Sequence, residues 1–151
     1  MSQIITDEIT TFVLVRHAEK ADDTHDPDLS SDGYERADLL AKMMEKIEFD
    51  AVYSTSFIRT TETARAVAEH NQLEIKEYDS EDPEIVAVEW EEKHRGESIL
   101  VAGHSNTVPI FANALLQREH FTELFDDSDY GNILMVTITS DNVRHILHIR
   151  F

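Results

Sequence analysis

Two arginines and two histidines of this sequence follow short apolar segments. Arg16 and His17 close the first such segment, Arg59 lies a few residues beyond the second, and His104 directly follows a later one. A guanidinium group matches phosphate oxygens in pairs, and an imidazole acts as an acid, a base or a nucleophile. Together these residue types predict a site for phosphoryl chemistry.

The apolar segments that precede these residues have the composition of buried β-strands. They span residues 11–16, 51–54 and 98–103, and most of their side chains are apolar. Such short runs are typical of strands covered on both faces. Ligands of open α/β sheets bind outside the carboxyl ends of the strands. We therefore expect the arginines and histidines to meet at one edge of a parallel sheet.

The rest of the chain alternates predicted helices with predicted strands. This alternation favours a single α/β domain over residues 1–151, built as a three-layer sandwich. Its central sheet is expected to be mainly parallel, flanked by helices, with an antiparallel hairpin at the C-terminal edge. The further strands are expected at 73–78, 133–139 and 143–151, and the helices at 57–70, 83–95, 107–116 and directly after Ser30 or Ser31.

Two of these helices carry specific expectations. The first begins with Ser30 or Ser31 as its N-cap. The helix at 107–116 is expected to take Ser105 or Asn106 as its cap. The apolar face of the first helix is predicted to consist of Leu39, Leu40, Met43, Met44 and Ile47.

Composition excludes several classes of function. The chain has 151 residues, with 13 Lys and Arg against 31 Asp and Glu, a formal net charge of −18. Such acidity argues against partners that are nucleic acids or anionic membranes. There is no cysteine, so disulfides and thiolate metal sites are excluded. Since no long apolar run or secretory signal is apparent, we expect a cytoplasmic protein.

Four segments resemble the signature elements of the histidine phosphatase superfamily, the phosphoglycerate mutase-like proteins. LVRHAEK at 14–20 resembles the Arg-His-Gly signature, and LSSDG at 29–33 resembles the Leu-Thr-x-x-Gly element. YSTSFIRTTETA at 53–64 resembles the second-arginine motif, and GHSN at 103–106 the second-histidine motif. The elements occur in the family's order and cover most of the chain.

The resemblance implies phosphotransfer without a metal or other cofactor. It makes His17 the nucleophile, which would form a covalent phosphohistidine that water then hydrolyses. It also implies that His104 is positively charged while it stabilises the transferring group. The residues expected to bind phosphate are Arg16, Arg59, His104, Ser105 and Asn106.

Two features depart from the family pattern. The usual Gly after the nucleophile is Ala18 here, so the loop is expected to differ slightly. The general acid of many members lies after the third strand, where Asp79 is the candidate and Glu81 and Asp82 are rivals. Members that act on phosphohistidine need no strong acid, because imidazole is already a good leaving group.

The short segment between Arg59 and His104 leaves no room for a large cap over the site. An open pocket favours the small, phosphohistidine-phosphatase-like branch of the family. The substrate would be a phosphorylated small molecule or a phosphohistidine protein. The alternatives are a phosphotransferase of the phosphoglycerate mutase type and a non-catalytic module that binds phosphate.

Overall fold

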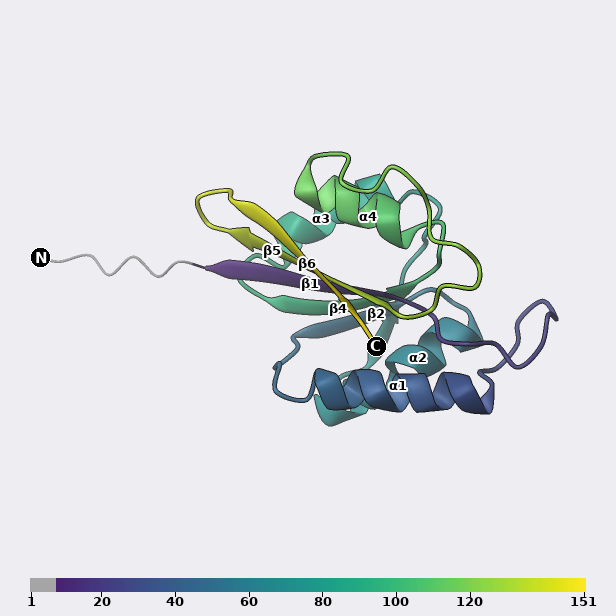
Figure 1. The fold of residues 1–151 in the computed structure, drawn as a ribbon. Coiled ribbons are helices and arrows are strands. Elements are labelled where there is room, and N and C mark those ends of the chain that lie inside the picture. The colour runs from purple at the N-terminus through teal and green to yellow at the C-terminus, as the bar shows by residue number, and fades with distance from the viewer. Residues whose placement is uncertain (1–7) are drawn as a thin grey trace, which may run out of the picture.

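A six-stranded sheet forms the middle layer of the molecule (Figure 1). In the computed structural model, which describes residues 8–151, the strand order is β3-β2-β4-β1-β5-β6. The first four strands along the chain are parallel, and β5 is antiparallel to both β1 and β6. Their bounds are β1 (Ile9–Arg16), β2 (Ala51–Ser54), β3 (Ile75–Glu77), β4 (Ser98–Gly103), β5 (Asn132–Thr139) and β6 (Arg144–Arg150).

Helices cover both faces of this sheet. Figure 1 shows α1 (Ser31–Met43) and α2 (Ile58–His70) on one face, and α3 (Pro83–Lys93) and α4 (Val108–Leu116) on the other. The predicted three-layer α/β sandwich with a C-terminal antiparallel hairpin is therefore confirmed. None of the helices within residues 8–151 is both long and apolar enough to cross a bilayer.

The unbroken apolar run of β1 is explained by burial on both sides. Phe12 packs in the core beneath α3 and α4, whereas Val13 packs in the core beneath α1 and α2. Both side chains are fully buried. A strand with two covered faces gains from apolar residues at every position.

The connections place the carboxyl ends of β1 and β4 beside each other at a switch in chain direction. The chain leaves β1 through α1 on one face and returns to β4 through α3 on the other face. Arg16 pairs with Gly103, and the His17 amide donates to the Gly103 carbonyl at 2.9 Å. In α/β sheets such a switch point is where ligands bind.

The structure corrects some details of the predicted elements. The strand expected at 73–78 is confined to Ile75–Glu77. In α1, Leu40 and Met44 are buried as predicted, but Leu39 and Met43 are exposed. This helix contacts the sheet through a narrow stripe at a spacing of three and four residues, so the apolar residues beside that stripe face outward. Ile47 lies beyond the end of the helix and is half-buried.

Candidate active site

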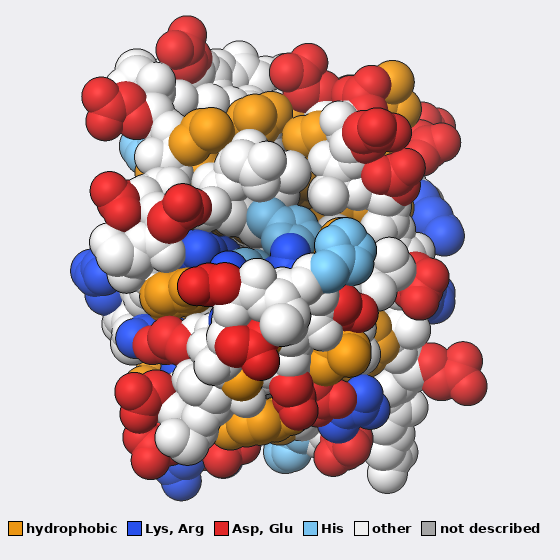
Figure 2. Space-filling view, turned by 90° about the vertical axis from the view of Figure 1, so that its right-hand side faces the viewer, with side chains coloured by type: hydrophobic (Ala, Val, Ile, Leu, Met, Phe, Trp, Pro, Cys, Tyr) orange, Lys and Arg blue, Asp and Glu red, His pale blue; other side chains and the backbone are white. Residues whose placement is uncertain are grey.

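The two arginines and two histidines predicted from the sequence do converge. The ring centroids of His17 and His104 are 5.5 Å apart, and the charges of Arg16 and Arg59 act on both rings. Figure 2 shows histidine and basic side chains in the middle of this face, with carboxylates around them. The site is thus a local positive centre in an acidic protein.

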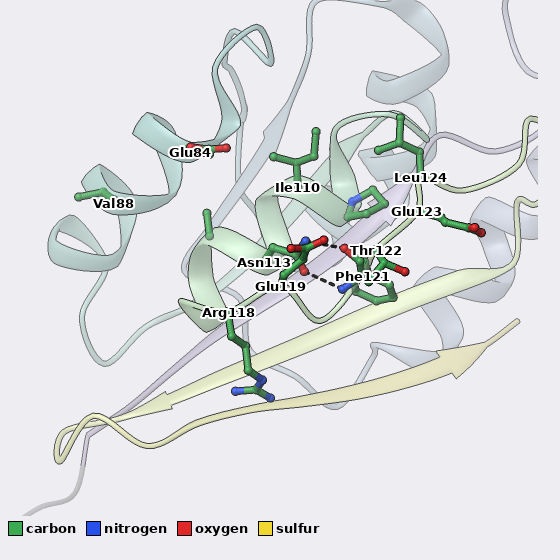
Figure 3. Close-up of a pocket in the computed structure, with 12 residues that line it drawn as sticks. Glu84, Val88, Ile110, Asn113, Arg118, Glu119, Phe121, Thr122, Glu123 and Leu124 are labelled. Carbon is green, nitrogen blue, oxygen red and sulfur yellow. Dashed lines mark hydrogen bonds between the residues drawn. The ribbon is translucent and has the colours of Figure 1, made fainter.

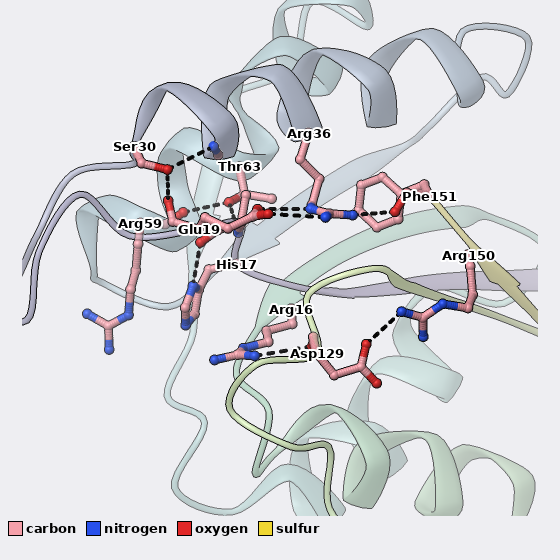
Figure 4. A network of polar contacts seen from close by, with 12 residues as sticks. Arg16, His17, Glu19, Ser30, Arg36, Arg59, Thr63, Asp129, Arg150 and Phe151 are labelled. Atoms are coloured by element: carbon pink, nitrogen blue, oxygen red, sulfur yellow. Dashed lines mark hydrogen bonds and ion pairs between the residues drawn. The ribbon is translucent and has the colours of Figure 1, made fainter.

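Arg16 is held by a loop that sequence reasoning missed. It is only 4% exposed, and its Nη1 donates to the carbonyls of Asp126, Asp127 and Asp129 at 3.3, 2.8 and 3.1 Å. Figure 4 shows the bond from Arg16 to Asp129. The guanidinium also lies over the Tyr130 ring, 4.0 Å from its centroid. No motif signalled this loop, because backbone carbonyls of any residue type serve equally well.

Both arginines keep a donor unused. Arg59 lies in the first turn of α2, and its guanidinium stands 4.4 Å from the centroid of the Phe57 ring. The Nε atoms of Arg16 and Arg59 are buried and find no hydrogen-bond partner among the described residues. A buried charged donor without an acceptor is costly, and a phosphate oxygen is the acceptor that guanidinium groups match best.

His17 is fixed as a neutral imidazole with one defined tautomer. Its Nδ1 lies 2.8 Å from the Ala18 carbonyl oxygen, which only accepts, so Nδ1 carries the proton and Nε2 keeps a free electron pair. Burial, followed by the charges of Arg16, His104 and Arg59, lowers the pKa of His17 to about 3, although the bond to Ala18 opposes this shift. An uncharged imidazole with a bare Nε2 is a competent nucleophile.

Two buried threonines fix the tautomer of His104. The Thr60 hydroxyl donates its proton to the carbonyls of Thr55 and Phe57, at 3.1 and 3.0 Å. The Thr55 hydroxyl, 2.8 Å from that of Thr60, therefore donates to it and accepts from His104 Nε2 at 2.9 Å. His104 thus keeps a proton on Nε2, and Nδ1 is the nitrogen that titrates. Burial, then Arg59 and Arg16, lowers the pKa of His104 to about 4.

The loop after His17 is held by the other predicted motifs. The Ala18 amide donates to Thr63 Oγ1 at 2.8 Å, and the Ser30 amide donates to the Glu19 carbonyl at 2.9 Å. Ser30 is also the N-cap of α1, accepting from the Gly33 amide. A Cβ on Gly33 would lie 2.3 Å from the Glu19 oxygen, so glycine is required there. Ala18 is buried and has no positive φ, which is why its methyl group is tolerated.

The segment after His104 differs from expectation. The prediction that Ser105 or Asn106 caps α4 is wrong, since the N-cap is Thr107. The Thr107 hydroxyl accepts from the His104 amide at 3.2 Å, and the His104 carbonyl accepts from the amides of Thr107 and Val108. These bonds close a turn before the helix begins. Ser105 is half-buried and Asn106 is exposed, so both remain next to the site without a capping role.

The candidate acids lie on an exposed loop. Asp79 accepts from the Glu81 amide at 2.9 Å and lines an open cleft of about 450 Å³ that also contains Thr55 and Phe57. Since Thr55 bonds His104 and the Phe57 ring lies 5.4 Å from its ring, the cleft borders the site. The rivals Glu81 and Asp82 are exposed and do not line this cleft. Within residues 8–151, no group of three or more acidic or histidine side chains is placed to hold a metal ion.

The fold and these four side chains define an α/β protein with a candidate oxyanion site at a sheet switch point. The family model of the histidine phosphatase superfamily (branch 1) matches residues 12–81. This match covers just under half of the chain and includes Arg16, His17 and Arg59.

Individual proteins are similar to this chain in part of its sequence or in its fold. Phosphoserine phosphatase 1 of Hydrogenobacter thermophilus is 38% identical over an alignment of 71 positions, which covers 42% of this chain and about a third (34%) of that protein. The protein histidine phosphatase SixA, solved with tungstate, has a TM-score of 0.76 at 18% identity, covering 93% of this chain and 96% of its own. A phosphoserine phosphatase of Entamoeba histolytica, solved with 3-phosphoglyceric acid, has a TM-score of 0.73 at 16% identity, covering 94% and 97%.

Proposed function

We propose that this protein is a phosphatase that needs no metal and hydrolyses phosphomonoesters or protein phosphohistidine. The observation that carries the proposal is the bare Nε2 of His17, set beside two arginines with unused donors. In the first step, His17 Nε2 attacks phosphorus, and the leaving group departs with the electrons of its bond to phosphorus and takes up a proton. Water then attacks the phosphohistidine, which releases phosphate and restores His17.

The charges of the site should stabilise the transition state more strongly than water does. Phosphoryl transfer is catalysed mainly by positioning and by stabilising the negative equatorial oxygens. Arg16 and Arg59 bring fixed positive charge, and a bound phosphoryl dianion favours the imidazolium form of His104, which then donates from Nδ1. Losing one such donor typically slows turnover by a factor on the order of 10²–10³. Ser105 and Asn106 are proposed as further phosphate contacts.

The exposed position of the candidate acid, Asp79, favours substrates with good leaving groups. Asp79 is exposed and borders the site across the cleft, so we assign it to protonating alkyl leaving groups. Phosphohistidine needs little such help. The proposal agrees with the names of the relatives, which include a protein histidine phosphatase and phosphoserine phosphatases. We infer that the protein acts in the cytoplasm, in keeping with its lack of cysteine.

The test is hydrolysis of para-nitrophenyl phosphate by the wild type and by His17→Ala, with EDTA present and folding checked by circular dichroism. We expect turnover by the wild type and none by the folded variant. Retained activity in His17→Ala, or loss of wild-type activity in EDTA, contradicts the mechanism. If the folded wild type binds phosphate but hydrolyses neither this ester nor a phosphohistidine peptide, the protein is a non-catalytic module that binds phosphate. Transfer of phosphate between positions of phosphoglycerate identifies the mutase.

A further inference from the structure

A groove of about 590 Å³ lies between α3, α4 and the loop 117–124 (Figure 3). Val88 of α3 and Leu124 of the loop stand on opposite sides of it, with Ile110 of α4 between them. We call this feature the α3–α4 groove. It is separate from the cleft that contains Asp79.

The α3–α4 groove has a fixed shape. Asn113 of α4 donates through Nδ2 to the Phe121 carbonyl at 2.9 Å. Its Oδ1 accepts from the amides of His120 and Phe121, at 3.0 and 2.9 Å. One side chain therefore ties the loop to the helix by three hydrogen bonds, so a ligand meets a wall that is already ordered.

The lining combines exposed apolar side chains with negative charge. Val88 is 70% exposed and Leu124 is 52% exposed, which leaves apolar surface open to water. Among the described residues that line the groove, the carboxylates of Glu84, Glu119 and Glu123 outnumber one cation, Arg118. The complementary partner carries apolar and positively charged side chains together.

Two segments of the chain connect the groove to the active site. Its floor includes Pro109 in the first turn of α4, five residues after His104. The loop that forms its wall continues directly into the active site: the Phe125 amide donates to the Ser105 carbonyl at 3.3 Å, and Asp127 then holds Arg16. Figure 2 shows apolar side chains above the histidines, on the side of α3 and α4, with carboxylates among them.

We propose that the α3–α4 groove docks a basic, partly apolar segment of a phosphoprotein, whose phosphorylated residue then enters the site of His17. This inference rests on the proposed phosphatase activity and names the substrate class. A chain with a net charge of −18 repels a small phosphorylated anion at long range, whereas lysines or arginines beside the phosphorylated residue reverse that force.

The first experiment compares three substrates at increasing salt. Two peptides carry one phosphohistidine between leucines, flanked either by lysines or by glutamates, and para-nitrophenyl phosphate serves as the groove-independent substrate. We expect kcat/KM for the lysine peptide to exceed that for the glutamate peptide by about tenfold or more at low salt. Added salt should lower kcat/KM for the lysine peptide and raise it for para-nitrophenyl phosphate, because screening weakens attraction and repulsion alike.

The second experiment changes the groove. Two double variants are made, Val88→Gln with Leu124→Gln and Glu84→Gln with Glu123→Gln. Each should lower kcat/KM for the lysine peptide about tenfold and leave para-nitrophenyl phosphate hydrolysis nearly unchanged. The matched controls are Leu147→Gln on β6 and Glu45→Gln after α1, both exposed and outside the groove.

The outcomes separate this inference from the proposed function. If the wild type hydrolyses para-nitrophenyl phosphate but neither peptide, or both peptides equally, docking in the groove is refuted while the phosphatase stands. Equal effects of groove and control variants on the lysine peptide refute it as well. A wild type without activity on any of the three substrates overturns the proposed function itself.

Discussion

Hydrogen bonds to fixed partners give the two histidines different tautomers. His17 donates through Nδ1 to a backbone carbonyl, which leaves Nε2 free to attack. His104 donates through Nε2 to Thr55, which leaves Nδ1 to carry the proton that a phosphoryl oxygen would accept. The proposed roles of the two histidines, nucleophile for His17 and cation for His104, follow from the opposite tautomers that their neighbours select.

Thr55→Val tests this division of roles at the level of one hydroxyl group. The variant removes the acceptor for His104 Nε2, so the ring loses its fixed tautomer, and we expect kcat to fall about tenfold to a hundredfold. Thr55→Ser keeps the hydroxyl and should restore most of the activity. Nitrogen NMR of the histidine rings should show His104 protonated at Nε2 in the wild type and in Thr55→Ser, but mixed in Thr55→Val. An unchanged tautomer in Thr55→Val would refute the role of this hydroxyl.

Asp79→Asn tests the candidate acid. If Asp79 protonates the leaving group, the variant should slow alkyl phosphate hydrolysis much more than aryl phosphate hydrolysis, because only the poor leaving group needs the proton. The measurement is kcat/KM for an alkyl and an aryl phosphate in both proteins, with Glu81→Gln and Asp82→Asn as matched controls. Equal losses on both substrates would count against Asp79.

At the scale of elements, the start of α1 packs tightly against the loop that follows His17. Gly33→Ala places a methyl carbon 2.3 Å from the Glu19 carbonyl oxygen, and because backbone atoms yield little, the helix or the loop must move. We expect the free energy of unfolding in urea to fall by about 1–3 kcal/mol. Ser31→Ala, at an exposed position in the same turn, is the control and should change it little. Equal stability of Gly33→Ala and the wild type would contradict the tight contact.

Sequence patterns predicted the strands that end at the site. Both faces of β1 and β4 are buried, so their sequences are nearly unbroken apolar runs. The same patterns could not find the loop that holds Arg16, since Asp127 contributes only its carbonyl. They also misplaced the start of α4, because Ser105 and Asn106 have good capping side chains, whereas the hydroxyl of Thr107 bonds back to His104. Interactions made by the backbone leave no trace in residue type.

At the scale of the whole molecule, burial of two neutral histidines links stability to pH. The pKa of His17 is lowered to about 3 and that of His104 to about 4, whereas both return to about 6.5 when the chain unfolds. Between these pH values the imidazoles of His17 and His104 are protonated in the unfolded chain but neutral in the folded chain. The free energy of unfolding therefore falls as pH decreases from about 6.5 toward 4.

Urea titrations across this pH range measure the effect. The wild type should lose on the order of 1 kcal/mol per pH unit for each histidine below pH 6. His17→Asn should lose less, because one of the two groups is gone. Inorganic phosphate should offset part of the loss by favouring charged His104. A wild type and a His17→Asn variant with the same dependence on pH would contradict the buried neutral state of His17.

The most direct test of the proposed mechanism is to trap the covalent intermediate on His17. The wild type is mixed with para-nitrophenyl phosphate, quenched in alkali, in which phosphohistidine survives, and examined by phosphorus NMR and by mass spectrometry of its peptides. We expect one phosphoryl group, on Nε2 of His17, in the presence of EDTA, and none in His17→Ala. Steady release of phosphate without a phosphohistidine, or a phosphoryl group on another residue, would contradict it.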